Sequence, residues 1–138
     1  MHLRVYQKRP DVGAVVHAHP IFATSFAVMG RGLEEPIMPE VMVNFGRVPL
    51  APYGTPSTVE IPDSIEPYLA EYEAVLLESH GALTWAQDLL SAYMKMESVE
   101  FYAELLYRTI QLGGPRLLSP CRLEKLYELT GRKKDGRK

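Results

Sequence analysis

The residues best suited to chemistry in this chain are three histidines that follow two short apolar runs. His17 and His19 lie in residues 15–20, and His80 directly follows residues 76–79. Residues two apart on a β-strand point to the same face, so the rings of His17 and His19 can reach one point. Three imidazoles plus one open or carboxylate position form a catalytic zinc site. A histidine on an apolar strand is often only a packed residue, and spacing alone leaves both interpretations open.

Composition limits the class of protein. A chain of 138 residues is long enough for one domain with a core, which we predict over residues 1–130, followed by a solvated basic tail over 131–138. The formal net charge of −2 gives no reason to expect binding to nucleic acid or to an anionic membrane. The lone Cys121 excludes an internal disulfide and fits a cytoplasmic protein. The fourth histidine, His2, has no partner spacing and is interpreted as helix surface or packing.

The segments that must position the histidines alternate between strand-like and helix-like patterns. We expect strands over residues 12–19, 48–53, 74–79 and 82–85, and helices over residues 1–9, 21–29, 65–72, 88–112 and 123–129. Residues 41–45 fit a strand or a short helix equally well. Pro49 and Pro52 place the second strand at an edge or a bulge. The alternation predicts an α/β layered domain.

Three motifs in this order resemble the class II aldolase/adducin family, which includes fuculose- and rhamnulose-phosphate aldolases and ribulose-phosphate 4-epimerase. The motifs are residues 9–20, 49–56 and 76–85, and the long helix with Ala92 and Glu100 also fits. The resemblance spans residues 1 to about 118. It implies a three-layer αβα sandwich around a largely antiparallel central sheet, here N-terminally truncated.

The resemblance also implies a cofactor and a reaction. His17, His19 and His80 would ligate Zn²⁺ or another divalent transition metal, as a zinc-dependent class II aldolase (a lyase) requires. Retro-aldol cleavage of a sugar phosphate or similar hydroxy-carbonyl substrate leaves a carbanion, which the metal stabilises as an ene-diolate. Epimerisation is the same cleavage followed by recombination on the other face. Neutral imidazole ligands leave the metal its full charge.

The sequence departs from the family in its catalytic groups. Family members carry an N-terminal segment with a phosphate-binding loop and an acid/base carboxylate, and nothing here can be assigned to either. The uncapped helix that opens on residue 1 likewise suggests a preceding segment. No Tyr lies between Leu33 and Arg47, where fuculose-phosphate aldolases place a proton donor. Glu40 is the residue of this segment taken as the candidate for a catalytic role, and a loop or helix-start carboxylate is at least as good an interpretation.

The remaining polar candidates have weaker signals. Glu78 could be a hydrogen-bond partner for an imidazole or a solvent-facing strand residue. Thr24 and Ser25 cap or pack, Tyr53 is a rim or interface aromatic, and Ser57 and Thr58 contact phosphate or form a turn, with the turn preferred.

Two functions follow, and they belong to different classes. The first is a zinc-dependent lyase acting on a small sugar-phosphate substrate, truncated here or completed by another polypeptide. The second is a non-catalytic aldolase/adducin-type interaction module, or an inactive fragment that keeps the metal site. The apolar run at residues 37–43 favours a homo-oligomer, tetramer first, with residues 34–45 at or near a subunit contact, although the run can also cover the sheet within one subunit.

Overall fold

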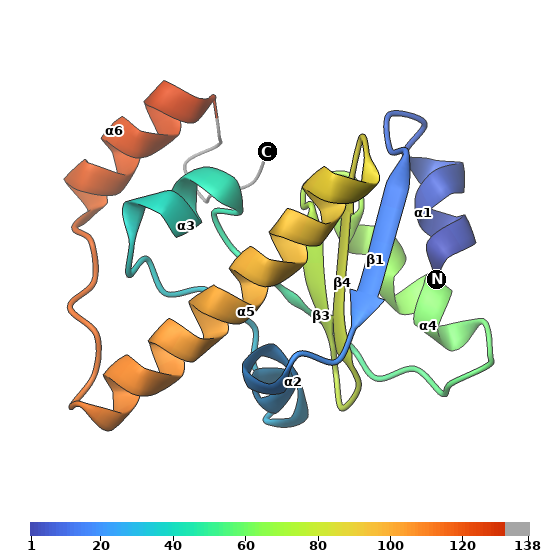
Figure 1. Ribbon diagram of the computed structural model, residues 1–138, viewed down its shortest axis with the longest axis horizontal. Coiled ribbons are helices and arrows are strands. Elements are labelled where there is room, and N and C mark those ends of the chain that lie inside the picture. The colour runs from blue at the N-terminus through green and yellow to red at the C-terminus, as the bar shows by residue number, and fades with distance from the viewer. Residues whose placement is uncertain (132–138) are drawn as a thin grey trace.

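A four-stranded sheet lies between two layers of helices in the computed structural model, which describes residues 1–131 (Figure 1). The strands are β1 (Ala14–Ala18), β2 (Leu50–Ala51), β3 (Ala74–Leu77) and β4 (Gly81–Ala86). The helices are α1 (His2–Lys8), α2 (Ile21–Val28), α3 (Pro39–Asn44), α4 (Glu60–Ile65), α5 (Leu89–Gln111) and α6 (Pro120–Thr130), and a 3-10 turn covers Glu66–Tyr68. The basic tail predicted at residues 131–138 lies, from residue 132 on, outside the described residues.

The strands are ordered β1-β4-β3-β2 across the sheet. β4 pairs antiparallel with both β1 and β3, whereas β2 pairs parallel with β3 at the edge. The largely antiparallel sheet is therefore as expected. The register sets Ala18 opposite Ala82 in one pair and Leu77 opposite Gly81 in the other. The turn between β3 and β4 consequently lies beside the end of β1.

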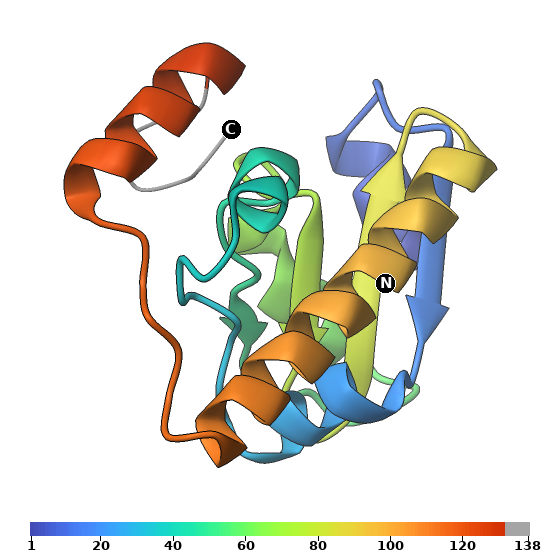
Figure 2. The same cartoon turned by 60° about the vertical axis from the view of Figure 1, so that its left-hand side comes forward.

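Alternating residues of the strands build two separate cores. On one face Leu76 and Ala82 pack with apolar side chains of α2, α3, α5 and α6. On the other face Val75 and Leu83 pack with Val5 of α1 and Ile65 of α4. Figure 2 shows α5 crossing the first face, with α1 on the opposite side of the sheet. The two cores confirm the three-layer αβα arrangement.

The long helix follows its sequence pattern closely. Asp88 caps α5 by accepting a hydrogen bond from the Ser91 amide, at 2.8 Å. Six apolar residues recur at helical spacing along α5, and five of them are buried, namely Ala92, Met96, Val99, Ala103 and Leu106. Ile110, the sixth, is 38% exposed because the helix extends beyond the sheet at that end.

Prolines explain where the expected elements were wrong. The helix expected over 65–72 instead runs over Glu60–Ile65, because Pro62 is tolerated in a first turn that needs no amide hydrogen there. Pro67 then has no amide to continue the α-helix, and the chain tightens into the 3-10 turn. Pro49 and Pro52 limit β2 to two residues at the sheet edge.

Residues 34–45 are covered within the chain more than their sequence suggested. Residues 39–44 form α3, which settles the ambiguity between strand and helix. Val41 and Met42 are buried in the core beneath α6, where the Tyr127 hydroxyl lies 3.8 Å from the Met42 sulfur. Val43 alone among these three residues is exposed, at 38%. The apolar run therefore gives less reason to expect a subunit contact than its composition implied.

Candidate metal centre

The fold brings the three predicted histidines together at one end of the sheet. His17 lies near the end of β1, His19 follows two residues later, and His80 lies in the turn between β3 and β4. Their ring centroids are 4.8, 4.9 and 5.0 Å apart, and one ring nitrogen from each lies within 4.8 Å of the others. Ligands about 2.05 Å from a tetrahedral zinc ion lie roughly 3.3 Å from one another. Small side-chain movements would therefore close this group around one metal ion.

A hydrogen bond fixes the orientation of the His17 ring. Its Nδ1 lies 2.9 Å from the Ala82 carbonyl oxygen, which can only accept, so Nδ1 carries the proton. The lone pair is then on Nε2, the atom left for a metal. Metal-bound histidines commonly donate their second N–H to a backbone carbonyl in this way. Sequence reasoning missed Ala82 because a backbone carbonyl leaves no signal in residue type.

The surroundings of His17 and His80 favour the neutral form of the imidazole, which is the form that a metal ligand needs. Burial lowers the pKa of His17 below its usual 6.5, the hydrogen bond that His17 donates to the Ala82 carbonyl oxygen opposes the shift, and the charges of His80 and His19 add to the lowering. Burial likewise lowers the pKa of His80, with His19 as the second cause. His2, on α1, also contributes to the lowering at His17, although it is not a member of the group. A neutral imidazole offers a lone pair that an imidazolium lacks.

The turn that carries His80 is sterically demanding. Ser79 adopts a left-handed conformation with φ of 57°. A Cβ atom at Gly81 would lie 2.5 Å from Cδ2 of His19 and 2.6 Å from the Ala18 carbonyl oxygen. Gly81 therefore allows the β3–β4 turn to approach β1 closely, which is what places His80 beside His19.

Glu78, two residues before His80, contacts Tyr53 in the loop after β2. The Glu78 carboxylate accepts a hydrogen bond from the Tyr53 amide at 2.8 Å. Glu78 thus anchors the loop after β2. The hydrogen-bond partner of the His17 imidazole, a role considered for Glu78, is instead the Ala82 carbonyl oxygen. Tyr53 is 58% exposed.

The other polar candidates divide between local structure and surface. The Thr58 hydroxyl donates to the Thr55 carbonyl oxygen and the Ser25 hydroxyl to that of Ile21, so both bond within their own segments. Ser57 has a left-handed φ of 66°, which fits the turn interpretation. Glu40 is exposed in the first turn of α3. Within residues 1–131, no carboxylate joins the three histidines in the metal-binding group.

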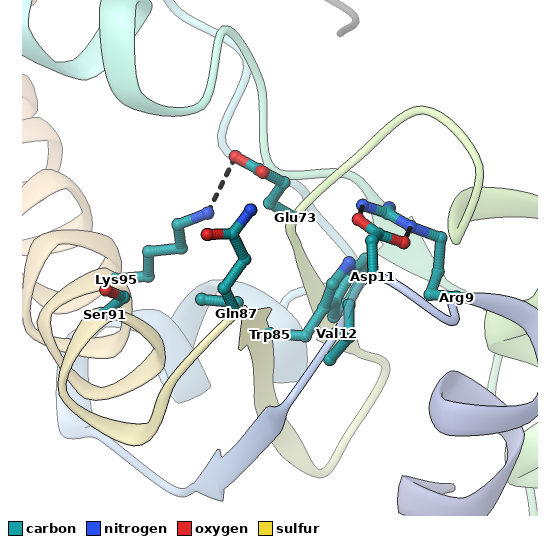
Figure 3. A pocket seen from close by; sticks show the side chains of 9 residues that line it. Arg9, Asp11, Val12, Glu73, Trp85, Gln87, Ser91 and Lys95 are labelled. Atoms are coloured by element: carbon teal, nitrogen blue, oxygen red, sulfur yellow. Dashed lines mark hydrogen bonds and ion pairs between the residues drawn. The ribbon is translucent and has the colours of Figure 1, made fainter.

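A pocket of about 250 Å³ lies at the end of β4 opposite the histidines, roughly 14 Å along the strand from Ala82 (Figure 3). Its charged side chains are paired. Lys95 binds Glu73 at 2.8 Å, and Arg9 binds Asp11 at 2.6 Å. These charges neutralise one another, so the pocket lacks the excess of positive charge that recognises a phosphate.

No helix within residues 1–131 has the length and apolar character needed to cross a membrane.

Comparisons with known proteins show which family the chain resembles. Residues 1–107 match the family described as the class II aldolase and adducin N-terminal domain. The chain is 35% identical over 127 residues to 5-deoxy-D-ribulose 1-phosphate aldolase of Bacillus thuringiensis serovar kurstaki, covering 91% of this chain and 59% of that protein. It is 32% identical over 111 residues to 3-oxo-tetronate 4-phosphate decarboxylase of Escherichia coli, covering 77% and 52%.

Solved structures extend the similarity to the fold. An L-fuculose 1-phosphate aldolase superimposes with a TM-score of 0.81 at 32% identity, covering 90% of this chain and 58% of that chain. The chain thus spans between half and three fifths of the length of these relatives. With a family match over most of its length and the same fold as a fuculose-phosphate aldolase, the chain belongs to the class II aldolase and adducin family.

Proposed function

We propose that His17, His19 and His80 bind one divalent transition metal, zinc first, and that the chain carries the metal-binding part of a zinc-dependent sugar-phosphate lyase. The observation that supports this most directly is the convergence of three imidazoles from two strand ends. The donor set also fits, because three neutral nitrogens are the protein ligands of many catalytic zinc sites.

The relatives indicate the reaction class. One is an aldolase and another a decarboxylase, and each acts on a phosphorylated compound by its name. Both reactions break a carbon–carbon bond and leave negative charge on carbon. A bound zinc ion supplies Lewis-acid stabilisation of such charge when the substrate carries a neighbouring carbonyl oxygen. We therefore propose retro-aldol cleavage of a sugar phosphate as the reaction, with epimerisation as a variant of it.

Within this proposal the residues of the chain have separate tasks. His17, His19 and His80 hold the metal, and the Ala82 carbonyl keeps the His17 lone pair on Nε2. Gly81 allows His80 to approach His19. Glu40 is proposed as the group that moves a proton, on the weaker ground that it is an exposed carboxylate in the first turn of α3.

Metal titration tests the site. The chain should take up one equivalent of Zn²⁺, His80→Ala should abolish stoichiometric uptake, and His2→Ala is the matched control, since His2 is a histidine outside the group. Equal uptake by the wild-type chain and His80→Ala would contradict the proposal.

An activity assay separates the lyase from the second candidate, a non-catalytic module that keeps the fold and the metal. The observation that favours the module is that no carboxylate of residues 1–131 joins the histidines. General acid–base help is typically worth about 10²–10⁴ in rate, or roughly 3–5 kcal/mol of barrier. We expect the 138-residue chain alone to cleave fuculose or rhamnulose phosphates weakly or not at all. Ordinary enzyme rates that are lost in Glu40→Gln would assign the proton transfer to Glu40.

A further inference from the structure

Helix α2 connects the two halves of the histidine site. It begins at Ile21, directly after His19 and Pro20, and so it fixes where the first histidine pair leaves β1. At its other end the Ala27 carbonyl oxygen accepts a hydrogen bond from the Ser79 amide at 3.1 Å, next to His80. A shift of α2 would therefore move both His19 and the turn that carries His80.

The helix cannot fix its own position. It has eight residues, its N-cap is Pro20, whose side chain makes no capping hydrogen bond, and its first turn contains no acidic residue. Isolated helices shorter than about 12 residues are marginal in water, so α2 depends on contacts with the rest of the protein. The amides of its first turn also need acceptors from elsewhere.

Glu100, near the middle of α5, provides those acceptors. Its two carboxylate oxygens accept hydrogen bonds from the Phe22 amide at 2.9 Å and from the Ala23 amide at 2.8 Å. A carboxylate at a helix N-terminus is favoured by the helix dipole, and such charge-assisted bonds are about twice as strong as neutral ones. The Phe22 and Tyr107 rings, 5.5 Å apart, add an apolar contact between the same two helices.

We propose that Glu100 is a positioning residue for the histidine site, acting through α2 rather than through the metal. By accepting the first amides of α2, Glu100 sets the position of the helix that joins His19 to the turn of His80. The expected effect on zinc affinity rests on the proposed metal-binding function, whereas the placement of α2 by Glu100 rests on hydrogen bonds.

The test compares Glu100→Gln with Glu104→Gln. A glutamine keeps the shape but has one oxygen, so it loses one of the two bonds and faces the other amide with its own N–H. Glu104 lies one turn further along α5 and pairs with Arg108 at 2.7 Å, so its variant removes the same charge without touching α2. Zinc is titrated into each variant after circular dichroism has shown that it is folded.

We expect Glu100→Gln to bind zinc about 10–100 times more weakly than the wild-type chain, the usual range for losing a group that orients metal ligands. Hydrogen exchange of the Phe22 and Ala23 amides should become faster in Glu100→Gln. Glu104→Gln should match the wild type in both measurements, and Glu100→Asp should recover part of the zinc affinity. Wild-type zinc affinity in Glu100→Gln, or an equal loss in Glu104→Gln, would overturn the inference. If Glu100→Gln does not fold, Glu100→Asp takes its place against the same control.

Failure of the proposed function is distinguishable from failure of this inference. If the wild-type chain binds no zinc, the proposed metal site is wrong, and NMR signals of the His19 and His80 rings in the metal-free chain then test Glu100. Those signals should shift in Glu100→Gln and stay in place in Glu104→Gln. Unchanged ring signals in Glu100→Gln would refute the role of Glu100.

Discussion

Replacing Gly81 by alanine should damage the histidine site by contact alone. The Cβ atom would lie 2.5 Å from Cδ2 of His19, whereas ordinary contacts begin at 3.4 Å, so one of the two groups must move by 3.4 − 2.5 = 0.9 Å. Metal–nitrogen bonds tolerate about 0.2 Å. Either the His19 ring or the turn that carries His80 would therefore be displaced by several times the tolerance. Overpacking of this kind typically costs about 1–3 kcal/mol of folding stability.

Gly13→Ala is the matched control for this change. Its Cβ would lie 2.2 Å from the Gln87 carbonyl oxygen, at the other end of the β1–β4 pair and away from the histidines. Urea unfolding should show both variants to be destabilised, while zinc titration should show a loss of at least about tenfold in Gly81→Ala only. Wild-type zinc affinity in Gly81→Ala, or the same loss in Gly13→Ala, would refute the steric argument.

Three further predictions concern acidity, capping and assembly. The pKa values of His17 and His80 are lowered in the folded chain, so the unfolded chain binds protons first as the pH falls below about 7.5. The folding stability of the metal-free chain should therefore decrease through pH 6.5 and below. The difference between the urea midpoints at pH 8 and pH 5.5 should be smaller in His17→Gln than in the wild-type chain. Asp88→Ala removes the cap of α5 and should cost about 1 kcal/mol in urea unfolding, and no loss would show the cap to be dispensable. Light scattering should show a homo-oligomer, tetramer first, and a monodisperse 15.6 kDa particle would contradict this.

The sequence by itself determined the elements whose signals are local. The pair His17 and His19 could be placed on one face because strand residues alternate, and α5 could be traced because its apolar residues recur at helical spacing. Short segments interrupted by prolines were harder to predict. The predicted position of α4 was wrong because the effect of Pro62 and Pro67 on a helix depends on where each lies within a turn. Helix propensity alone does not reveal that position.

The tertiary structure decided what joins the local pieces into a site. Whether His80 meets the other two histidines depends on the register between β1 and β4, and on a glycine that allows close approach. The partner of His17 is a backbone carbonyl, and the acceptor at the start of α2 lies 77 residues away in the sequence on α5. Register, backbone acceptors and contacts between distant segments arise only when the chain packs, because the periodicity of a sequence describes each element relative to itself and not to its neighbours.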